Sequence, residues 1–170
     1  MCKLFGSKDP KPEEIVLVPD GKDVIRTMLN YALEFVGTPY RWGGDDPIDG
    51  FDCSGYAQEV LASVSMDPPG DQTAQALHNH FLMDGGVSLK ECQAGAFLFY
   101  GKSVTQITHV SIGLNHFQII EAGGGGSTTT SREAAAQQNA YIRVRGCDRR
   151  PDLVAIVLPD YSKALRAKIT

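Results

Sequence analysis

The chain has 170 residues, a length that suits one domain with a sizeable core, alone or with short tails. Its 42% hydrophobic and 21% charged residues are typical of a globular protein, and its net charge of −4 provides no basic field for nucleic acid or an anionic membrane. No apolar run approaches the roughly 20 residues that span a bilayer, so we expect no nucleic-acid partner and no membrane insertion.

The first predicted elements are a tail and two helices. Residues 1–20 are polar and proline-bearing, and we expect a flexible N-terminal arm there. Apolar residues recur at helical spacing from Val24 to Val36, and Gly37 can end that helix. A loop rich in glycine and aspartate follows over residues 40–50. A second amphipathic helix is predicted to begin near Cys53.

A third helix is predicted over residues 71–83. Its two histidines, His78 and His80, fall on different faces, so we interpret them as solvated side chains and not as a metal pair. The cysteines are far apart and form no CxxC pair, which argues against a zinc knuckle or a disulfide framework. We therefore expect no metal and no cofactor. The four cysteines are Cys2, Cys53, Cys92 and Cys147.

Strands are predicted after the helices. The strand-like runs cover residues 96–100, 109–114, 117–122, 141–145 and 153–158. This order predicts an α+β fold with N-terminal helices packed on one face of a central antiparallel β-sheet. We expect one domain over residues 21–160 and a tail over 161–170. The glycine-rich segment 123–130 lacks the lysine of a phosphate loop and is predicted to border the cleft, as a lid or a substrate rim.

Cys53 is the candidate nucleophile. Asp52 stands before it as a natural N-cap, and the positive end of the helix dipole favours a thiolate at this position. A nucleophilic cysteine needs a histidine, and His109 at the start of an apolar strand is the best partner. Ser111 and Gly113 share its strand face and are small, so we expect that face to leave room for a ligand.

Glu121 is the candidate third residue, and strand parity decides whether it reaches His109. An odd-numbered loop centred at Asn115 would oppose the two residues and put the carboxylate beside the imidazole. A two-residue turn would point the carboxylate to the other face. We prefer the first register because a carboxylate fixes the imidazole tautomer and stabilises the imidazolium.

Four segments together resemble one protein family. They are residues 37–44 (GTPYRWGG), 52–55 (DCSG), 94–99 (AGAFLF) and 109–114 (HVSIGL). The chain resembles the NlpC-type cell-wall peptidases, which are papain-like cysteine peptidases of bacteria and their phages. The resemblance covers roughly residues 24–122 and implies a papain-like NlpC-type fold.

The resemblance also implies a reaction and its catalytic residues. Cys53 would be the nucleophile and His109 the general base. The third polar residue is usually a histidine in the family, and Glu121 replaces it here. The expected reaction is hydrolysis of peptide bonds in peptidoglycan stem peptides, such as the bond between D-glutamate and a diamino acid. The acyl-enzyme would form on Cys53 while backbone N–H groups near the helix start stabilise the oxyanion.

Three further residues carry a substrate role by the same resemblance. Tyr40 would line the cleft beside the nucleophile, while Asp52 and Ser54 would help to bind the stem peptide. Four arginines near the C-terminus are interpreted as a solvated strand face, with a role at the cleft rim as the alternative. These arginines are Arg143, Arg145, Arg149 and Arg150.

Other functions stay open at this point. The same nucleophile and base would serve an amidase that cuts between sugar and peptide, or a thiol acyltransferase. A non-catalytic wall-binding or virion module could keep the fold. The start of the chain lacks the apolar core of a secretory signal, so we expect cytoplasmic synthesis. That favours a phage protein, released at lysis or assembled into the virion with tail proteins as partners.

Overall fold

The computed structural model describes residues 20–164. The expected N-terminal arm lies outside this range except for Asp20, and so does the tail from residue 165. Four helices are formed within the described residues: α1 (Gly21–Leu33), α2 (Cys53–Ala62), α3 (Ala74–Met83) and α4 (Arg132–Gln138). The first three helices precede the main sheet in the chain, as the sequence predicts.

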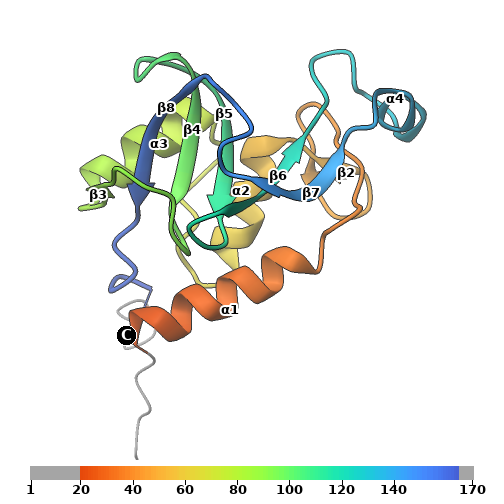
Figure 1. The fold of residues 1–170 in the computed structure, drawn as a ribbon. Helices are drawn as coiled ribbons and strands as arrows, with labels where there is room; N and C mark the ends of the chain where they lie inside the picture. The colour runs from red at the N-terminus through yellow and green to blue at the C-terminus, as the bar shows by residue number, and fades with distance from the viewer. Residues whose placement is uncertain (1–19, 165–170) are drawn as a thin grey trace, which may run out of the picture.

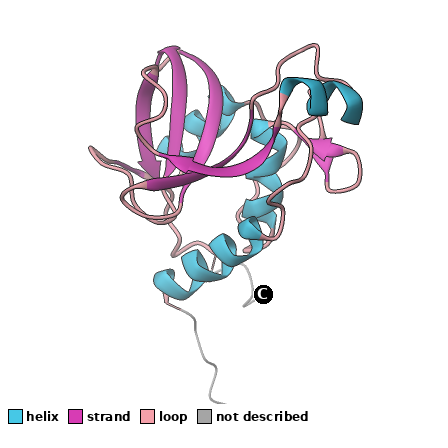
Figure 2. Cartoon of the chain, turned by 45° about the vertical axis from the view of Figure 1, so that its right-hand side comes forward, coloured by secondary structure: helices cyan, strands magenta, loops and turns pink. Residues whose placement is uncertain are grey.

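A curved antiparallel sheet forms the centre of the molecule (Figures 1 and 2). Its strand order is β3-β8-β4-β5-β6-β7. The strands are β3 (Val87–Ser88), β4 (Phe97–Ser103), β5 (Gln106–Gly113), β6 (Gln118–Gly123), β7 (Tyr141–Gly146) and β8 (Leu153–Leu158). Helices α2 and α3 pack against this sheet, and α1 crosses below it in contact with α2 (Figure 1). The predicted α+β architecture is therefore confirmed.

The helix starts follow from capping side chains. Asp20, Asp52 and Thr73 each accept a hydrogen bond from a backbone N–H of the first turn of α1, α2 and α3. Helix α4 was not expected from the sequence analysis, although its signals are present. Ser131 caps its start, and Asn139 ends it in the left-handed conformation with φ of 54°.

The two faces of the sheet are filled differently. Phe97 and Phe99 point into the large core between the sheet and the helices, whereas Leu98 and Tyr100 belong to a smaller cluster on the opposite face. His78 enters the large core too. It is 5% exposed and packs edge-to-face on Phe99 with ring centroids 5.1 Å apart, so the interpretation of His78 as a solvated side chain is wrong.

Two small features complete the domain. The loop before α2 holds a two-stranded ribbon of β1 (Asp45–Asp46) and β2 (Gly50–Phe51). Beyond β8 the chain still packs on the core, because Tyr161 is 5% exposed and its hydroxyl donates to the Gly95 carbonyl at 2.6 Å. We therefore propose that the domain extends through residue 164, past the predicted boundary at 160. Every helix within residues 20–164 is too short or too polar to span a bilayer.

Candidate active site

Cys53 is the first residue of α2, as predicted, and Asp52 is its N-cap. One carboxylate oxygen of Asp52 accepts hydrogen bonds from the backbone N–H groups of Ser54 and Gly55, both at 2.9 Å. The other oxygen accepts from the Gly43 N–H at 3.0 Å. Asp52 therefore holds the helix start, which carries Cys53, and the preceding glycine loop together.

The glycines of the two motifs allow this close approach. The Asp52 N–H donates to the Gly44 carbonyl at 2.9 Å, so the loop lies directly on the first turn of α2. A Cβ atom added at Gly55 would overlap the Gly44 carbonyl oxygen. The paired glycine and Asp-Cys-Ser-Gly motifs thus form one packed unit that fixes the position of the Cys53 thiol.

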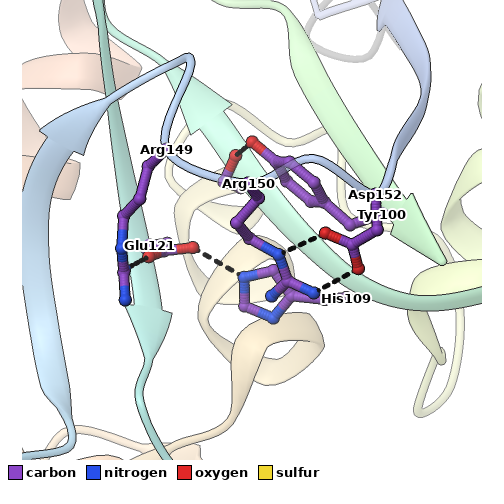
Figure 3. Close-up of polar contacts among 7 residues, drawn as sticks. Tyr100, His109, Glu121, Arg149, Arg150 and Asp152 are labelled. Atoms are coloured by element: carbon purple, nitrogen blue, oxygen red, sulfur yellow. Dashed lines mark hydrogen bonds and ion pairs between the residues drawn. The ribbon is translucent and has the colours of Figure 1, made fainter.

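His109 on β5 and Glu121 on β6 form a buried pair. The Nε2 atom of His109 lies 2.7 Å from Glu121 Oε2, and the two residues are 9% and 2% exposed (Figure 3). Because Nε2 faces the carboxylate, Nδ1 is the ring nitrogen left for Cys53, whose side chain hydrogen-bonds to His109. The structure therefore brings the three predicted catalytic residues together.

The hairpin register differs by one step from the predicted register. Gly113 pairs with Ile119, and continuing this register places Glu121 opposite Ser111. The expected direct opposition of His109 and Glu121 is therefore wrong. The predicted odd parity is right, so the two residues are diagonal neighbours on one face, and their long side chains bridge the offset.

The turn geometry explains the shift. Leu114 N–H donates to the Gln118 carbonyl at 2.8 Å, which centres the turn on His116. Asn115, the predicted centre of the turn, does not have a positive φ. Its side-chain oxygen instead accepts from the N–H groups of Phe117 at 2.8 Å and Gln118 at 3.0 Å, which is an Asx-type turn.

The surrounding charges favour an imidazolium at His109. Burial alone would lower the pKa of His109, but hydrogen bonds and negative charge from Cys53 and Glu121 outweigh it and raise the pKa to about 9. Burial would likewise raise the pKa of the Glu121 carboxyl, yet His109, Arg149 and Arg150 hold it below its usual value. Glu121 is thus kept as an anion and His109 as a cation.

Arg149 is a site residue that the sequence analysis did not single out from its arginine cluster. Its Nη1 lies 2.7 Å from Glu121 Oε1, so each carboxylate oxygen has its own partner. Arg150 forms two hydrogen bonds with Asp152, at 2.9 and 2.6 Å, and lies over the Tyr100 ring (Figure 3). For these two arginines the interpretation as a solvated strand face is wrong, because they come from the β7–β8 loop and contact the site.

The small residues near His109 do not leave a ligand space. Tyr100 pairs with His109 across β4 and β5, with ring centroids 5.6 Å apart, and its hydroxyl is 3.1 Å from the Ser111 hydroxyl. A Cβ atom at Gly113 would overlap the carbonyl oxygen of Gln93. The small side chains therefore make room for the protein's own segments, and the expected open face is wrong.

Tyr40 lies near the nucleophile and is 4% exposed. Burial raises its pKa, and the nearby negative charges of Cys53 and Asp52 raise it further, so the hydroxyl stays a hydrogen-bond donor. The glycine-rich segment borders this residue, since a Cβ atom at Gly125 would overlap the Tyr40 ring. Thr129 is fully buried there, and its carbonyl accepts from the Trp42 N–H at 2.8 Å.

The backbone N–H groups at the start of α2 differ in whether they already have a hydrogen-bond acceptor. Asp52 occupies the N–H groups of Ser54 and Gly55, and the Tyr56 N–H donates to the Asp52 carbonyl at 3.0 Å. Among the described residues, the Cys53 N–H has no hydrogen-bond acceptor. The Cys53 N–H is therefore the donor available to a bound oxygen atom. Across residues 20–164, no group of three or more histidine, cysteine, aspartate or glutamate side chains could hold a metal ion.

Comparison with protein families gives a direct match. The model of the NlpC/P60 family matches residues 37–146, a range that contains the six residues predicted to be catalytic or substrate-binding but not Arg149. The NlpC/P60 domain of the peptidoglycan hydrolase SagA is a structural neighbour, with a TM-score of 0.58 and 28% identity. That superposition covers 78% of this chain and 97% of the SagA domain.

Two curated relatives come from Bacillus subtilis. The bifunctional muramidase/DL-endopeptidase CwlT is 37% identical over 109 residues, which are 63% of this chain and 30% of CwlT. The gamma-D-glutamyl-L-lysine dipeptidyl-peptidase is 30% identical over 111 residues, 64% of this chain and 36% of that enzyme. The chain thus spans about a third of the length of these relatives.

Proposed function

The chain belongs to the NlpC/P60 family, and from that premise we propose that it is a papain-like cysteine endopeptidase of bacterial peptidoglycan. The contact that carries this proposal is the Cys53–His109–Glu121 arrangement, in which one ring nitrogen of His109 faces the cysteine and the other is held 2.7 Å from a buried carboxylate. Such an arrangement activates a thiol for attack on a carbonyl carbon.

The substrate we propose is the stem peptide, cleaved between D-glutamate and the diamino acid that follows. CwlT is named a DL-endopeptidase, and the second relative is named for a gamma-D-glutamyl-L-lysine bond. Both names point to the same type of peptide bond. We extend that specificity to this chain on the strength of 37% and 30% identity across the matched domain.

The proposed reaction is acyl transfer through Cys53. The thiolate attacks the D-glutamyl carbonyl carbon and forms a tetrahedral intermediate. His109 then gives its proton to the leaving amine, the C–N bond breaks, and a thioester remains on Cys53. Water attacks the thioester while His109 takes its proton, which releases the carboxylic acid and restores the thiolate–imidazolium pair. Glu121 keeps the imidazole oriented and charged throughout.

Two donors are proposed to hold the oxyanion. The Cys53 N–H has no acceptor among the described residues, and the Tyr40 hydroxyl stays protonated beside the nucleophile. The N–H groups of Ser54 and Gly55 are excluded because they already bond to Asp52. Of the backbone N–H groups near the start of α2 that the sequence analysis expected to stabilise the oxyanion, only that of Cys53 is proposed to do so.

Asp52 and Ser54 are proposed to contact the stem peptide beside the scissile bond. The Ser54 hydroxyl donates to Asp52 at 3.0 Å and keeps its lone pairs free to accept from a substrate. The Asp52 oxygen that bonds to Gly43 can take a further donor, such as a substrate amino group. A phage source and tail-protein partners stay predictions from the sequence.

Digestion of purified peptidoglycan tests the proposal. Wild type and Cys53→Ala are incubated with the same wall preparation, and the soluble products are identified by mass spectrometry. New stem-peptide fragments with a D-glutamate terminus are expected from wild type alone. Sugar fragments, or peptides released intact from the sugar as by an amidase, would contradict the reaction class. Equal products from Cys53→Ala would contradict the nucleophile.

A further inference from the structure

Two cysteines outside the active site, Cys92 and Cys147, converge on one turn. Cys92 lies in the loop before β4, and Cys147 directly follows β7. The Cys92 thiol donates to the Asn115 carbonyl at 3.1 Å, and the Cys147 thiol donates to the His116 carbonyl at 3.4 Å. Because these carbonyls belong to neighbouring residues, both sulfur atoms lie against the β5–β6 turn.

The two thiols also interact directly. Burial raises the pKa of Cys92 to about 11, and the charge and hydrogen bond of Cys147 add to that rise. Cys92 is 5% exposed, whereas Cys147 is more exposed and packs against its cluster from outside. Both line a surface hollow of about 620 Å³. Both lie outside the strands, and a disulfide between them requires a Cα separation of roughly 5.5 Å.

We propose that Cys92 and Cys147 form a disulfide when the protein is in the oxidising surroundings of the cell wall. This proposal rests on the proposed function. Peptidoglycan lies outside the reducing cytoplasm, and disulfides form and persist in such oxidising surroundings. A single crosslink of this kind differs from the disulfide framework that the cysteine spacing argues against. It joins the segment before β4 to the loop between β7 and β8.

The oxidant is a disulfide, either a small molecule such as oxidised glutathione or the exposed disulfide of an oxidoreductase. The Cys147 thiolate attacks one sulfur of the oxidant and releases one thiol. The Cys92 thiolate then attacks the Cys147 sulfur, forms the Sγ–Sγ bond and releases the second thiol. The protein loses two electrons and two protons, and the oxidant is reduced to two thiols.

The crosslink would restrain the β7–β8 loop, which carries the arginine that bonds to Glu121. Cys147 opens the β7–β8 loop, and Arg149, two residues later, bonds to the Glu121 carboxylate at 2.7 Å. A covalent bond at the start of this loop removes freedom from the unfolded chain and keeps the arginine near its partner. We therefore expect oxidation to stabilise the fold, while the reduced protein keeps the same site contacts.

The test uses the full chain with Cys53→Ala, which removes the nucleophile as a competing thiol. The protein is incubated with oxidised or reduced glutathione, free thiols are alkylated, and tryptic peptides are weighed. In this variant trypsin separates the three remaining cysteines into peptides 1–3, 91–102 and 146–149. We expect peptides 91–102 and 146–149 to be joined, two hydrogen masses below their sum, and the Tm to rise by about 5 °C or more.

Cys147→Ser in the same background is the matched control, and we expect neither the joined peptides nor the Tm rise. Glutathione on Cys147 with a free, alkylated Cys92 would overturn the proposal, and so would crosslinks that run through Cys2. Neither the joined peptides nor the Tm depends on peptidase activity of the protein itself. A wild-type chain that forms the crosslink but leaves peptidoglycan intact would refute the proposed function alone.

Discussion

His109 owes its charge to two neighbours on opposite sides of its ring. Burial disfavours the imidazolium, and the contacts with Cys53 and Glu121 overcome that penalty to raise the pKa of His109 to about 9. A base of this kind keeps its proton well above neutral pH and can deliver it to a leaving amine. The protonation state of His109 therefore depends on both Cys53 and the buried Glu121 carboxylate.

Replacing that carboxylate should change the pH profile. In Glu121→Gln the negative charge beside His109 is lost, so the imidazolium gives up its proton at lower pH. We expect the alkaline limb of kcat/KM to move down by about one pH unit or more and the rate at neutral pH to fall roughly 10- to 100-fold. Glu133→Gln on the surface helix α4 is the control. An unmoved alkaline limb would remove Glu121 from the site.

Arg149 is a positioning residue, and we expect its replacement to shift the acid limb of the pH–rate profile. Its charge helps to keep the pKa of Glu121 low, so Arg149→Gln should let the carboxylate protonate at higher pH. We expect the acid limb of kcat/KM to move up by about 0.5 pH unit or less, because the Arg149 side chain is 42% exposed and partly screened. Arg143→Gln is the matched control, since Arg143 bonds to Asn139. Identical profiles for the two variants would deny Arg149 this role.

At this scale, local motifs were predictable from the sequence. Cys53 and its N-cap Asp52 are adjacent in the chain, so the helix start was predictable from them alone. The parity of the β5–β6 hairpin was predictable too, but its centre was not, because Asn115 holds the turn through its side chain. Arg149 could not be placed, since its contact depends on a loop that returns over β6 from far along the sequence.

At the scale of elements, Asp52 connects α2 to the glycine loop. Asp52→Ala removes three backbone hydrogen bonds, so we expect a loss of about 1–2 kcal/mol in the free energy of unfolding and a clear fall in kcat as Cys53 shifts. Thr73→Ala removes the N-cap of α3 and should cost about 1 kcal/mol without changing kcat. Urea unfolding and initial rates measure both. Equal kcat losses in the two variants would contradict the positional role of Asp52.

The glycine-rich segment packs on Tyr40, and two neighbouring glycines test that contact. A side chain at Gly125 would overlap the Tyr40 ring, whereas a Cβ atom at Gly126 meets nothing within 4 Å. We expect Gly125→Ala to lower kcat/KM roughly tenfold and to destabilise the fold by about 1–3 kcal/mol. Gly126→Ala should be close to neutral in both. Similar effects from both variants would show that the contact between Gly125 and Tyr40 affects neither kcat/KM nor stability.

At the scale of the whole molecule, the first three helices and most strands were predictable because their apolar periodicity is local. The packing of α2 on β5 and β6 follows from those apolar faces and brings Cys53 to His109. Helix α4 was not predicted although Ser131 and Asn139 mark its ends. Arg149 and Arg150 were assigned to a solvated strand face, with the cleft rim as the alternative, because the β7–β8 connection places them at the site and no periodic pattern signals such a loop.

The central claim is that Cys53 is the nucleophile of a stem-peptide endopeptidase. Its most direct test is the initial rate at which new amino groups appear from a synthetic stem peptide that contains one D-glutamyl–diamino acid bond. We expect cleavage at that bond by wild type and a loss of at least about 10³-fold in Cys53→Ala, with the fold of the variant checked by its Tm. A folded Cys53→Ala protein that cleaves this bond at the wild-type rate would contradict the account.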